Sequence, residues 1–235
     1  MTGPIPSPNI WDDPETYEIE NAAFDRARSI EAAMAAHRSF VGARVLDLGC
    51  GTGFHLQRWA DLGAARVVGA EPHRPLTALA RARLDELPPS TRERISVVAA
   101  GAADLPFRDG SIDLMHARWA YFFGSGCEPG LAELDRVMSP GGLACVIDND
   151  LTTRSTFGDW FATAYPAYDP DATERFWSRR GWERRSVRVS WQFERRTDLE
   201  AVVRIEFPPA AAERILAAHP ELTTDYAVVL RTRRY

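Results

Sequence analysis

The sequence predicts an α/β fold in which a doubly wound, mostly parallel sheet carries helices on both faces. Short apolar runs alternate with amphipathic segments along most of the chain, a pattern typical of repeated strand–helix–strand units. A glycine-rich segment at residues 49–53 connects the first apolar run to an amphipathic run, so that a strand, a loop and a helix follow one another. A length of 235 residues suits one such domain with additions, and no internal repeat or second domain is indicated.

The N-terminal part is predicted to precede the sheet. Residues 1–14 contain four prolines and are expected to form a loose arm. Residues 15–38 carry apolar side chains at helical spacing and predict one helix. The first strand then ends at Asp47, and the run 56–62 predicts the helix that follows the glycine-rich loop.

The middle of the chain continues the alternation. Residues 67–71 form a second apolar run that ends in a carboxylate. Residues 75–87 predict a helix, because a proline stands in its first turn and two prolines follow its last. Three further apolar strands are expected at 95–99, 112–116 and 143–147.

The last third has a different pattern. Residues 184–193 alternate apolar and charged side chains, as a half-exposed antiparallel strand does. Two helices and a final strand are expected at 198–205, 209–218 and 224–232.

The glycine-rich loop predicts a binding site for a small ligand. Glycine lets the backbone adopt positive φ and approach a ligand closely, while the following helix presents free N–H groups. A dinucleotide fingerprint would require its third glycine at position 54, which is Phe54. NAD(P) is therefore disfavoured. Glu71 ends the second strand about twenty residues later, where nucleotide-binding α/β folds hold the ribose hydroxyls, and we expect it to bind a ribose.

Five segments together resemble the class I S-adenosylmethionine-dependent methyltransferases, small-molecule type, over residues 40–150. They are 45–53, 71–72, 101–107, 112–117 and 134–142, in the family's order. The resemblance implies a Rossmann-like, three-layer αβα fold whose sheet order is 3-2-1-4-5-7-6 with strand 7 antiparallel. It also divides residues 15–235 of the single domain into a lid helix at 15–38, a cofactor-binding core at 40–150 and C-terminal helices and strands at 151–235.

The resemblance implies S-adenosylmethionine as the cofactor and a set of residues around it. Asp47 would orient the glycine loop and accept from the methionine ammonium, or else cap the turn, and the Cys50 side chain would fill a small space. Leu76 would pack on the adenine or on its own helix. The expected cofactor-binding residues are Asp47, Gly49, Cys50, Gly51, Gly53, Glu71, Pro72, Leu76, Ala102, Ala103 and Ala117. The chain departs from the family at Gly101, where an acidic residue often receives the adenine amino group, and Asp104 is a possible substitute.

The methyl acceptor is expected at the carboxyl edge of the sheet. His55 follows the glycine loop and His116 ends the fourth strand, so each is a candidate general base or a structural residue. Trp119 and Tyr121 follow that strand and favour an apolar or aromatic acceptor, with core packing as the alternative. Tyr17 and Asn21 stand four residues apart on the predicted lid helix and are expected to face the substrate.

Composition excludes several function classes. A net charge of −5 argues against a nucleic-acid or anionic-membrane surface and favours a small-molecule substrate. All 28 cationic side chains are arginine, which excludes Schiff-base and P-loop lysine chemistry. Three scattered cysteines indicate neither disulfides nor a metal site, and Asp148, Asn149 and Asp150 fit a turn better than a magnesium site. With no apolar membrane span and no signal-like N-terminus, a cytoplasmic protein is expected.

These predictions combine into one functional expectation: transfer of a methyl group from S-adenosylmethionine to a small acceptor by in-line displacement. Oxygen, nitrogen and carbon all stay open as the accepting atom, and so does the oligomeric state. Two other functions stay open as alternatives. The fold could bind the cofactor without transferring a methyl group, or the chain could be a nicotinamide-dependent dehydrogenase, which Phe54 disfavours.

Overall fold

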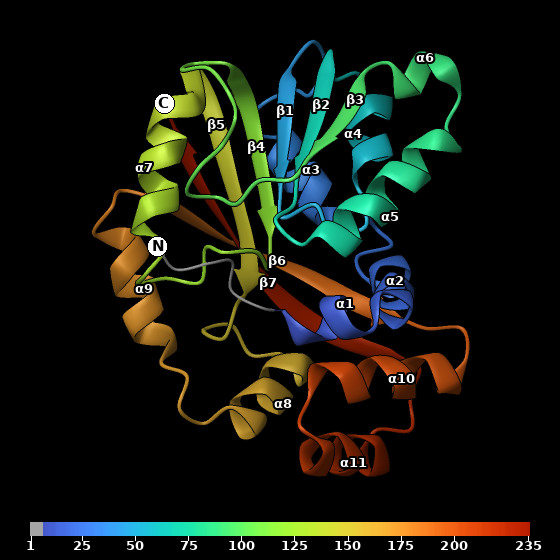
Figure 1. Cartoon of the computed structure of the whole chain (residues 1–235). Helices are drawn as coiled ribbons and strands as arrows, with labels where there is room; N and C mark the ends of the chain where they lie inside the picture. The colour runs from blue at the N-terminus through green and yellow to red at the C-terminus, as the bar shows by residue number, and fades with distance from the viewer. Residues whose placement is uncertain (1–6) are drawn as a thin grey trace.

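A computed structural model describes residues 7–235 and contains one seven-stranded sheet with the order β3-β2-β1-β4-β5-β7-β6 (Figure 1). The strands from β3 to β5 in this order pair in parallel, and β7 is antiparallel to both β5 and β6. The predicted fold class, sheet order and direction of the last strand are confirmed. The strands are β1 Arg44–Leu48, β2 Arg66–Ala70, β3 Ile95–Val98, β4 Ile112–Arg118, β5 Met138–Asn149, β6 Glu183–Gln192 and β7 Thr223–Arg234.

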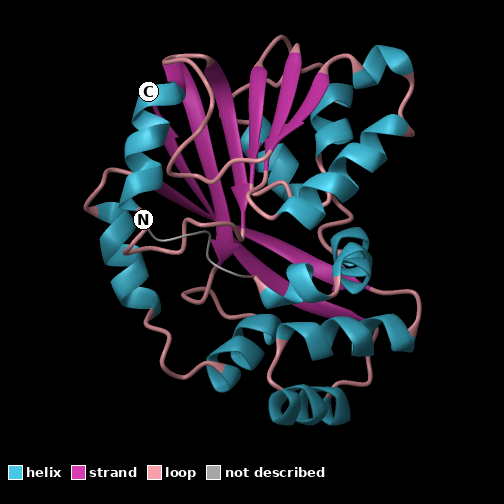
Figure 2. Ribbon diagram, viewed as in Figure 1, coloured by secondary structure: helices cyan, strands magenta, loops and turns pink. Residues whose placement is uncertain are grey.

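Helices lie on both sides of this sheet, as Figure 2 shows. They are α1 Pro8–Asp12, α2 Pro14–Ala23, α3 Ser29–Ala35, α4 Leu56–Asp61, α5 Arg74–Asp85, α6 Pro89–Arg92, α7 Glu128–Val137, α8 Thr156–Ala164, α9 Pro170–Ser178, α10 Arg196–Glu206 and α11 Pro209–Ala218. None of the helices in residues 7–235 is both long and apolar enough to cross a lipid bilayer.

Two apolar clusters cover the two faces of the sheet, because successive side chains of a strand point to opposite faces. Val45 and Leu114 face a cluster that includes side chains of α3, α4 and α5. Their chain neighbours Leu46 and Met115 face the other cluster, which includes side chains of α7 and α9. The face on which a residue lies therefore decides which helices it meets.

The N-terminal region differs from the prediction in two ways. Residues 7–12 of the predicted loose arm contain the short helix α1, and residues 1–6 lie outside the described residues. The single helix predicted at 15–38 is wrong, because the chain turns between α2 and α3. Phe24 is extended and forms a bridge to Trp191 of β6. Asp25 has a φ of 48°, and its carboxylate accepts from the N–H groups of Ser29 and Ile30 at the start of α3.

Helices α8 and α9 were not predicted, although both have recognisable start signals. Ser155 accepts from the N–H of Gly158 at the start of α8, and Asp169 accepts from the N–H of Ala172 at the start of α9. Strands β5 and β7 are also longer than predicted, because they pair with each other from Leu143 to Asn149 and β7 pairs further with β6.

Helices from the first and last thirds of the described chain gather at one edge of the sheet. Helices α1, α2, α8, α10 and α11 gather at the end toward which the β4 and β5 arrows point (Figure 1). Helix α2 packs against α10 and β6, and α1 packs against α2 and α10. The carboxyl ends of β1 and β4 therefore face a layer built from the first and last parts of the chain.

Candidate cofactor and acceptor site

The glycine loop after β1 is crowded on several sides. Gly49, Gly51 and Gly53 have φ values of 72°, 54° and 80°. A Cβ atom on Gly49 would collide with Ala120 of the loop after β4, and one on Gly51 would lie 2.7 Å from Cδ1 of Ile10 in α1. Only glycine satisfies both the positive φ and these close approaches. The loop thus lies directly against both the N-terminal helix and the segment after β4.

Glu71 lies at the carboxyl end of β2, with a relative exposure of 4%. Its carboxylate accepts from the N–H of Gly51 at 3.1 Å and from the N–H of His73 at 2.8 Å, and burial raises its pKa. Each oxygen can still accept further bonds, so Glu71 fixes the glycine loop and retains the capacity to bind two hydroxyl groups.

The residues around this loop fit an adenosyl group. Leu76 is buried, yet it belongs to neither of the two core clusters. Ala102 is buried, Ala103 and Asp104 are exposed, and Pro72 is half-buried. Glu71 would hold the ribose, while Leu76 and the backbone of residues 101–103 would meet the base.

Two residues expected at the cofactor have side chains that point elsewhere. The Cys50 sulfur occupies the space beside Gly69, where a Cβ would lie 2.6 Å from it, so Cys50 fills a gap between β1 and β2. The Ala117 side chain is buried in the second core cluster. Both can reach a ligand through backbone atoms only.

Asp47 and His116 form a buried pair with Trp59 of α4. They are direct neighbours on the adjacent strands β1 and β4, so both side chains lie on the same face of the sheet. Asp47 Oδ1 lies 2.9 Å from His116 Nδ1, and Oδ2 accepts from Trp59 Nε1 at 3.0 Å. Each carboxylate oxygen therefore has a protein partner, and the predicted contact of Asp47 with the methionine ammonium stays a prediction.

The environment of His116 favours its neutral form. Burial lowers its pKa, and the attraction of Asp47 only partly opposes this. Because Asp47 is hydrogen-bonded to Nδ1, the proton belongs on that nitrogen. Nε2 is buried and has no hydrogen-bond partner among the described residues.

His55 lies beside His116, with 5.5 Å between the ring centroids. Its ring also packs near Phe54 and Trp59. Burial lowers the pKa of His55 well below its usual value, and the positive field of Arg118 lowers it further. The structure thus brings both candidate bases together, each in a form that can accept a proton.

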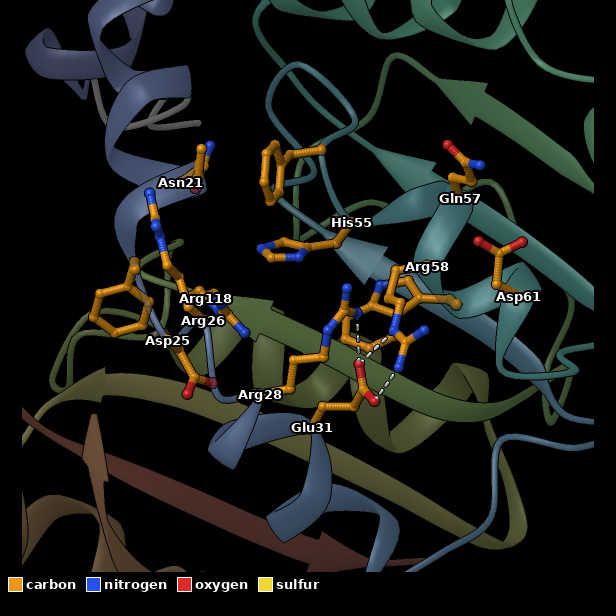
Figure 3. A pocket seen from close by; sticks show the side chains of 14 residues that line it. Asn21, Asp25, Arg26, Arg28, Glu31, His55, Gln57, Arg58, Asp61 and Arg118 are labelled. Carbon is orange, nitrogen blue, oxygen red and sulfur yellow. Dashed lines mark hydrogen bonds and ion pairs between the residues drawn. The ribbon is translucent and has the colours of Figure 1, made fainter. Parts of the chain in front are cut away.

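A pocket of about 450 Å³ opens next to His55 (Figure 3). It is built from the end of α2, the turn before α3, α3 itself, the residues just before α4, α4 itself and the end of β4. Its volume suits a small organic molecule. Apolar rings and charged groups both line it, among them Phe24, Asp25, Phe54, His55, Trp59 and Arg118.

Only some of the residues expected to bind the acceptor line this pocket. Asn21 lines the pocket with His55, whereas Tyr17 and Trp119 do not. Trp119 instead packs edge-on against Phe24 and donates to Asn149 Oδ1 at 2.8 Å. Its φ of 46° is strained for a bulky residue.

Tyr121 lies on the other side of the sheet from this group. It also has positive φ, 60°, and its ring packs against Gly130 of α7, where its hydroxyl accepts from the Gly130 N–H at 3.3 Å. The grouping of Tyr121 with the histidines is therefore wrong, because the turn after β4 directs its ring into the second core cluster.

Several pocket residues could not be found from the sequence, because they come from separate elements. Arg118 had one available signal, since it is a cationic residue that closes an otherwise apolar strand at the ligand-binding edge. No sequence signal pointed to Asp25, Arg28 or Arg58. Asp150 accepts from Thr152 and Arg184, as expected for a turn, and residues 7–235 contain no cluster arranged to hold a metal ion.

Part of the sequence resembles known methyltransferases. A model of a methyltransferase domain matches residues 45–142. Cypemycin N-terminal methyltransferase from a Streptomyces species is 31% identical over 170 residues, which cover 68% of this chain and 64% of that protein. The chain spans 51–64% of the length of the first curated relatives it matches.

Solved structures share the fold. A methyltransferase-like protein from Bacillus halodurans matches 87% of this chain and 97% of its own with a TM-score of 0.61 and 15% identity. The cyclase SpnF matches 89% of this chain and 81% of its own with a TM-score of 0.59 and 20% identity.

The sheet order, the glycine loop and the buried carboxylate that holds this loop together define a Rossmann-like fold of the methyltransferase type. The chain belongs to the class I S-adenosylmethionine-dependent methyltransferases, and S-adenosylmethionine is the cofactor of this family.

Proposed function

We propose that this protein transfers the methyl group of S-adenosylmethionine to a small acceptor bound in the pocket beside His55. The observation that carries this proposal is the direct contact between the two halves of the site. Ala120, two residues after Arg118 of the pocket, lies against Gly49 of the cofactor loop, and His55 follows that loop directly.

When bound, the cofactor supplies a methyl group on a positively charged sulfur, which needs no protein nucleophile. The protein's part is to bind and orient. Glu71 and the loop hold the adenosyl end, and the pocket positions the acceptor and excludes water. His55 takes the proton that an oxygen or nitrogen acceptor loses as its bond to carbon forms, and the His116 ring packs edge-to-face with the His55 ring.

The decisive experiment identifies the acceptor. The purified protein is incubated with methyl-labelled S-adenosylmethionine and fractionated small-molecule extracts, and labelled products are found by mass spectrometry. We expect a labelled small molecule together with S-adenosylhomocysteine, and both should be strongly reduced with Glu71→Ala at a cofactor concentration near the wild-type dissociation constant. Absence of S-adenosylhomocysteine binding in calorimetry would overturn the proposal at its first step.

A cofactor-binding protein without methyl transfer is the second candidate, since the cyclase SpnF has the same fold. Under that function S-adenosylhomocysteine binds to the wild-type protein, yet no extract yields a labelled product. A fluorescence titration with NADH tests the dehydrogenase alternative, and we expect no binding because the third glycine of that fingerprint is Phe54.

A further inference from the structure

Arg118 is the last residue of β4, and its guanidinium reaches into the pocket (Figure 3). Three other arginines line the same pocket, and each has an ion pair: Arg26 with Glu194, and Arg28 and Arg58 with Glu31. Among residues 7–235 no such pair is formed by Arg118, and its Nε is buried without a hydrogen-bond partner.

The nearby carboxylates already have other partners. Asp25 accepts from two backbone N–H groups at the start of α3. Glu31 accepts from Nε and an Nη of Arg58, both at 2.6 Å. The remaining neighbours of the Arg118 guanidinium are aromatic, with its central carbon 5.8 Å from the ring centre of Phe24 and 5.9 Å from that of Trp119.

Arg118 is half-buried and its buried Nε lacks a protein partner, so the charge of this guanidinium is less well stabilised than that of an arginine with an ion pair. A guanidinium presents a planar fork of donors that matches a carboxylate. An acidic ligand in the pocket would supply the missing partner and would leave the ion pairs of Arg28 and Arg58 intact.

We propose that Arg118 binds a carboxylate of the methyl acceptor, so that the substrate class is a small carboxylic acid with an apolar body. This inference rests on the proposed function. The rings of Phe24, Phe54 and Trp59 line the pocket and suit the apolar body, while the methylated group lies toward His55. A carboxylate is favoured over a phosphate, because one free guanidinium satisfies a single negative charge and a phosphate dianion needs further donors.

The test compares three probes of similar shape: phenylacetate, phenylacetamide and phenyl phosphate. Their dissociation constants are measured by ligand-observed NMR with S-adenosylhomocysteine present, for wild type, Arg118→Gln and Arg214→Gln. Arg214 is exposed on α11 and provides the same loss of charge away from the pocket.

We expect wild type to bind phenylacetate at least about tenfold more tightly than phenylacetamide. Arg118→Gln should abolish this preference and Arg214→Gln should keep it. Equal affinity for acid and amide in wild type overturns the proposal without any variant, and so does tighter binding of phenyl phosphate. A preference that survives in folded Arg118→Gln overturns the role of Arg118.

S-adenosylhomocysteine binding is measured separately by calorimetry. Intact cofactor binding without a preference for the acid overturns the carboxylate inference alone. Loss of cofactor binding in wild type overturns the proposed function as well.

Discussion

Single residues of the site have roles that their neighbours define. Asp47 is acidic and ends a strand, which is compatible with holding a ligand, with capping a turn or with orienting a side chain. In the structure its two oxygens bind His116 and Trp59. Asp47 therefore positions the histidine pair, whereas Glu71 combines fixing the loop with spare acceptor capacity.

Replacing Glu71 with Ala removes the proposed ribose ligand. We expect the affinity for S-adenosylhomocysteine to fall by about 1.5–3 kcal/mol, roughly ten- to hundredfold in calorimetry. Glu86→Ala, at an exposed position after α5, serves as the control and should bind like wild type. Unchanged affinity in a folded Glu71→Ala protein would place the cofactor elsewhere.

A substitution at Gly101 is expected to tighten cofactor binding. Its φ is outside the positive region, and a Cβ atom there would have no neighbour within 4 Å, so a side chain can be added without strain. Gly101→Asp should restore the adenine contact that is common in the family and tighten S-adenosylhomocysteine binding about three- to tenfold. The melting temperature should not change. Unchanged affinity would show that residue 101 does not face the adenine.

The two histidines predict a pH-dependent rate. His55 accepts a proton only when neutral, and its pKa is well below the usual value of about 6.5. Turnover should therefore be constant near neutral pH and fall only when acid protonates His55, well below pH 6.5. His55→Gln should lose roughly 10²–10⁴ in rate together with this acidic limb.

His116→Asn is the matched variant at the second histidine. If His55 is the base, His116→Asn should lower the rate but keep the acidic limb. A His55→Gln enzyme that retains both rate and pH profile would assign catalysis to orientation alone.

Among the elements, α2 and α10 form a contact that depends on protonation. Glu20 of α2 and Glu206 of α10 lie close together, and burial raises the pKa of both carboxyl groups. The negative charge of Glu206 raises the pKa of Glu20 further, to well above its usual value. Asn9 of α1 donates to Glu206, and Trp191 of β6 and the Tyr17 and Tyr226 hydroxyls also face the pair. Because ionising either carboxyl group is unfavourable here, protonation of the pair favours the packing of α2 against α10.

The sign of this effect follows from the raised pKa values. Below about pH 4 both carboxyl groups are protonated in folded and unfolded chains, and the contact has its full strength. As pH rises through the raised pKa values, the folded state must ionise a buried pair, and stability is lost.

Glu20→Gln keeps a hydrogen-bonding side chain and removes the charge. It should raise the melting temperature at pH 8 by about 2–4 °C, equivalent to about 1 kcal/mol, and change it little at pH 4. Glu15→Gln, exposed on the same helix, should have no such pH-dependent effect. Equal shifts at both pH values would mean that the pair does not titrate.

At the scale of the whole molecule, segments distant in sequence share one core. The first core cluster contains Phe24, Trp59, Val203 and Leu230, which come from the N-terminal, cofactor-binding and C-terminal parts of the predicted division. We therefore propose that residues 15–235 unfold as one unit. Calorimetry should give a single transition whose calorimetric and van't Hoff enthalpies agree, and two separate transitions would contradict this proposal.

The sequence alone determined the sheet and the cofactor loop. The periodicity of the strands, the glycine spacing at 49–53 and the carboxylate at Glu71 are patterns of residues close in sequence. Such patterns can be predicted, because they depend on the backbone conformation and burial of neighbouring residues. The order of the motifs indicated the family, and the family resemblance predicted the order of the strands. The structure confirms this strand order.

Only the tertiary structure decided the acceptor side. The pairing of Asp47 with His116 joins residues 69 positions apart, and it depends on which strands are neighbours and on their register. The turn at Asp25, the opposite directions of Trp119 and Tyr121, and the unpaired guanidinium of Arg118 depend likewise on segments that meet only in three dimensions. The sequence gives the chemistry of each side chain. Its partners depend on the face of the sheet on which it lies and on the register of the neighbouring strands.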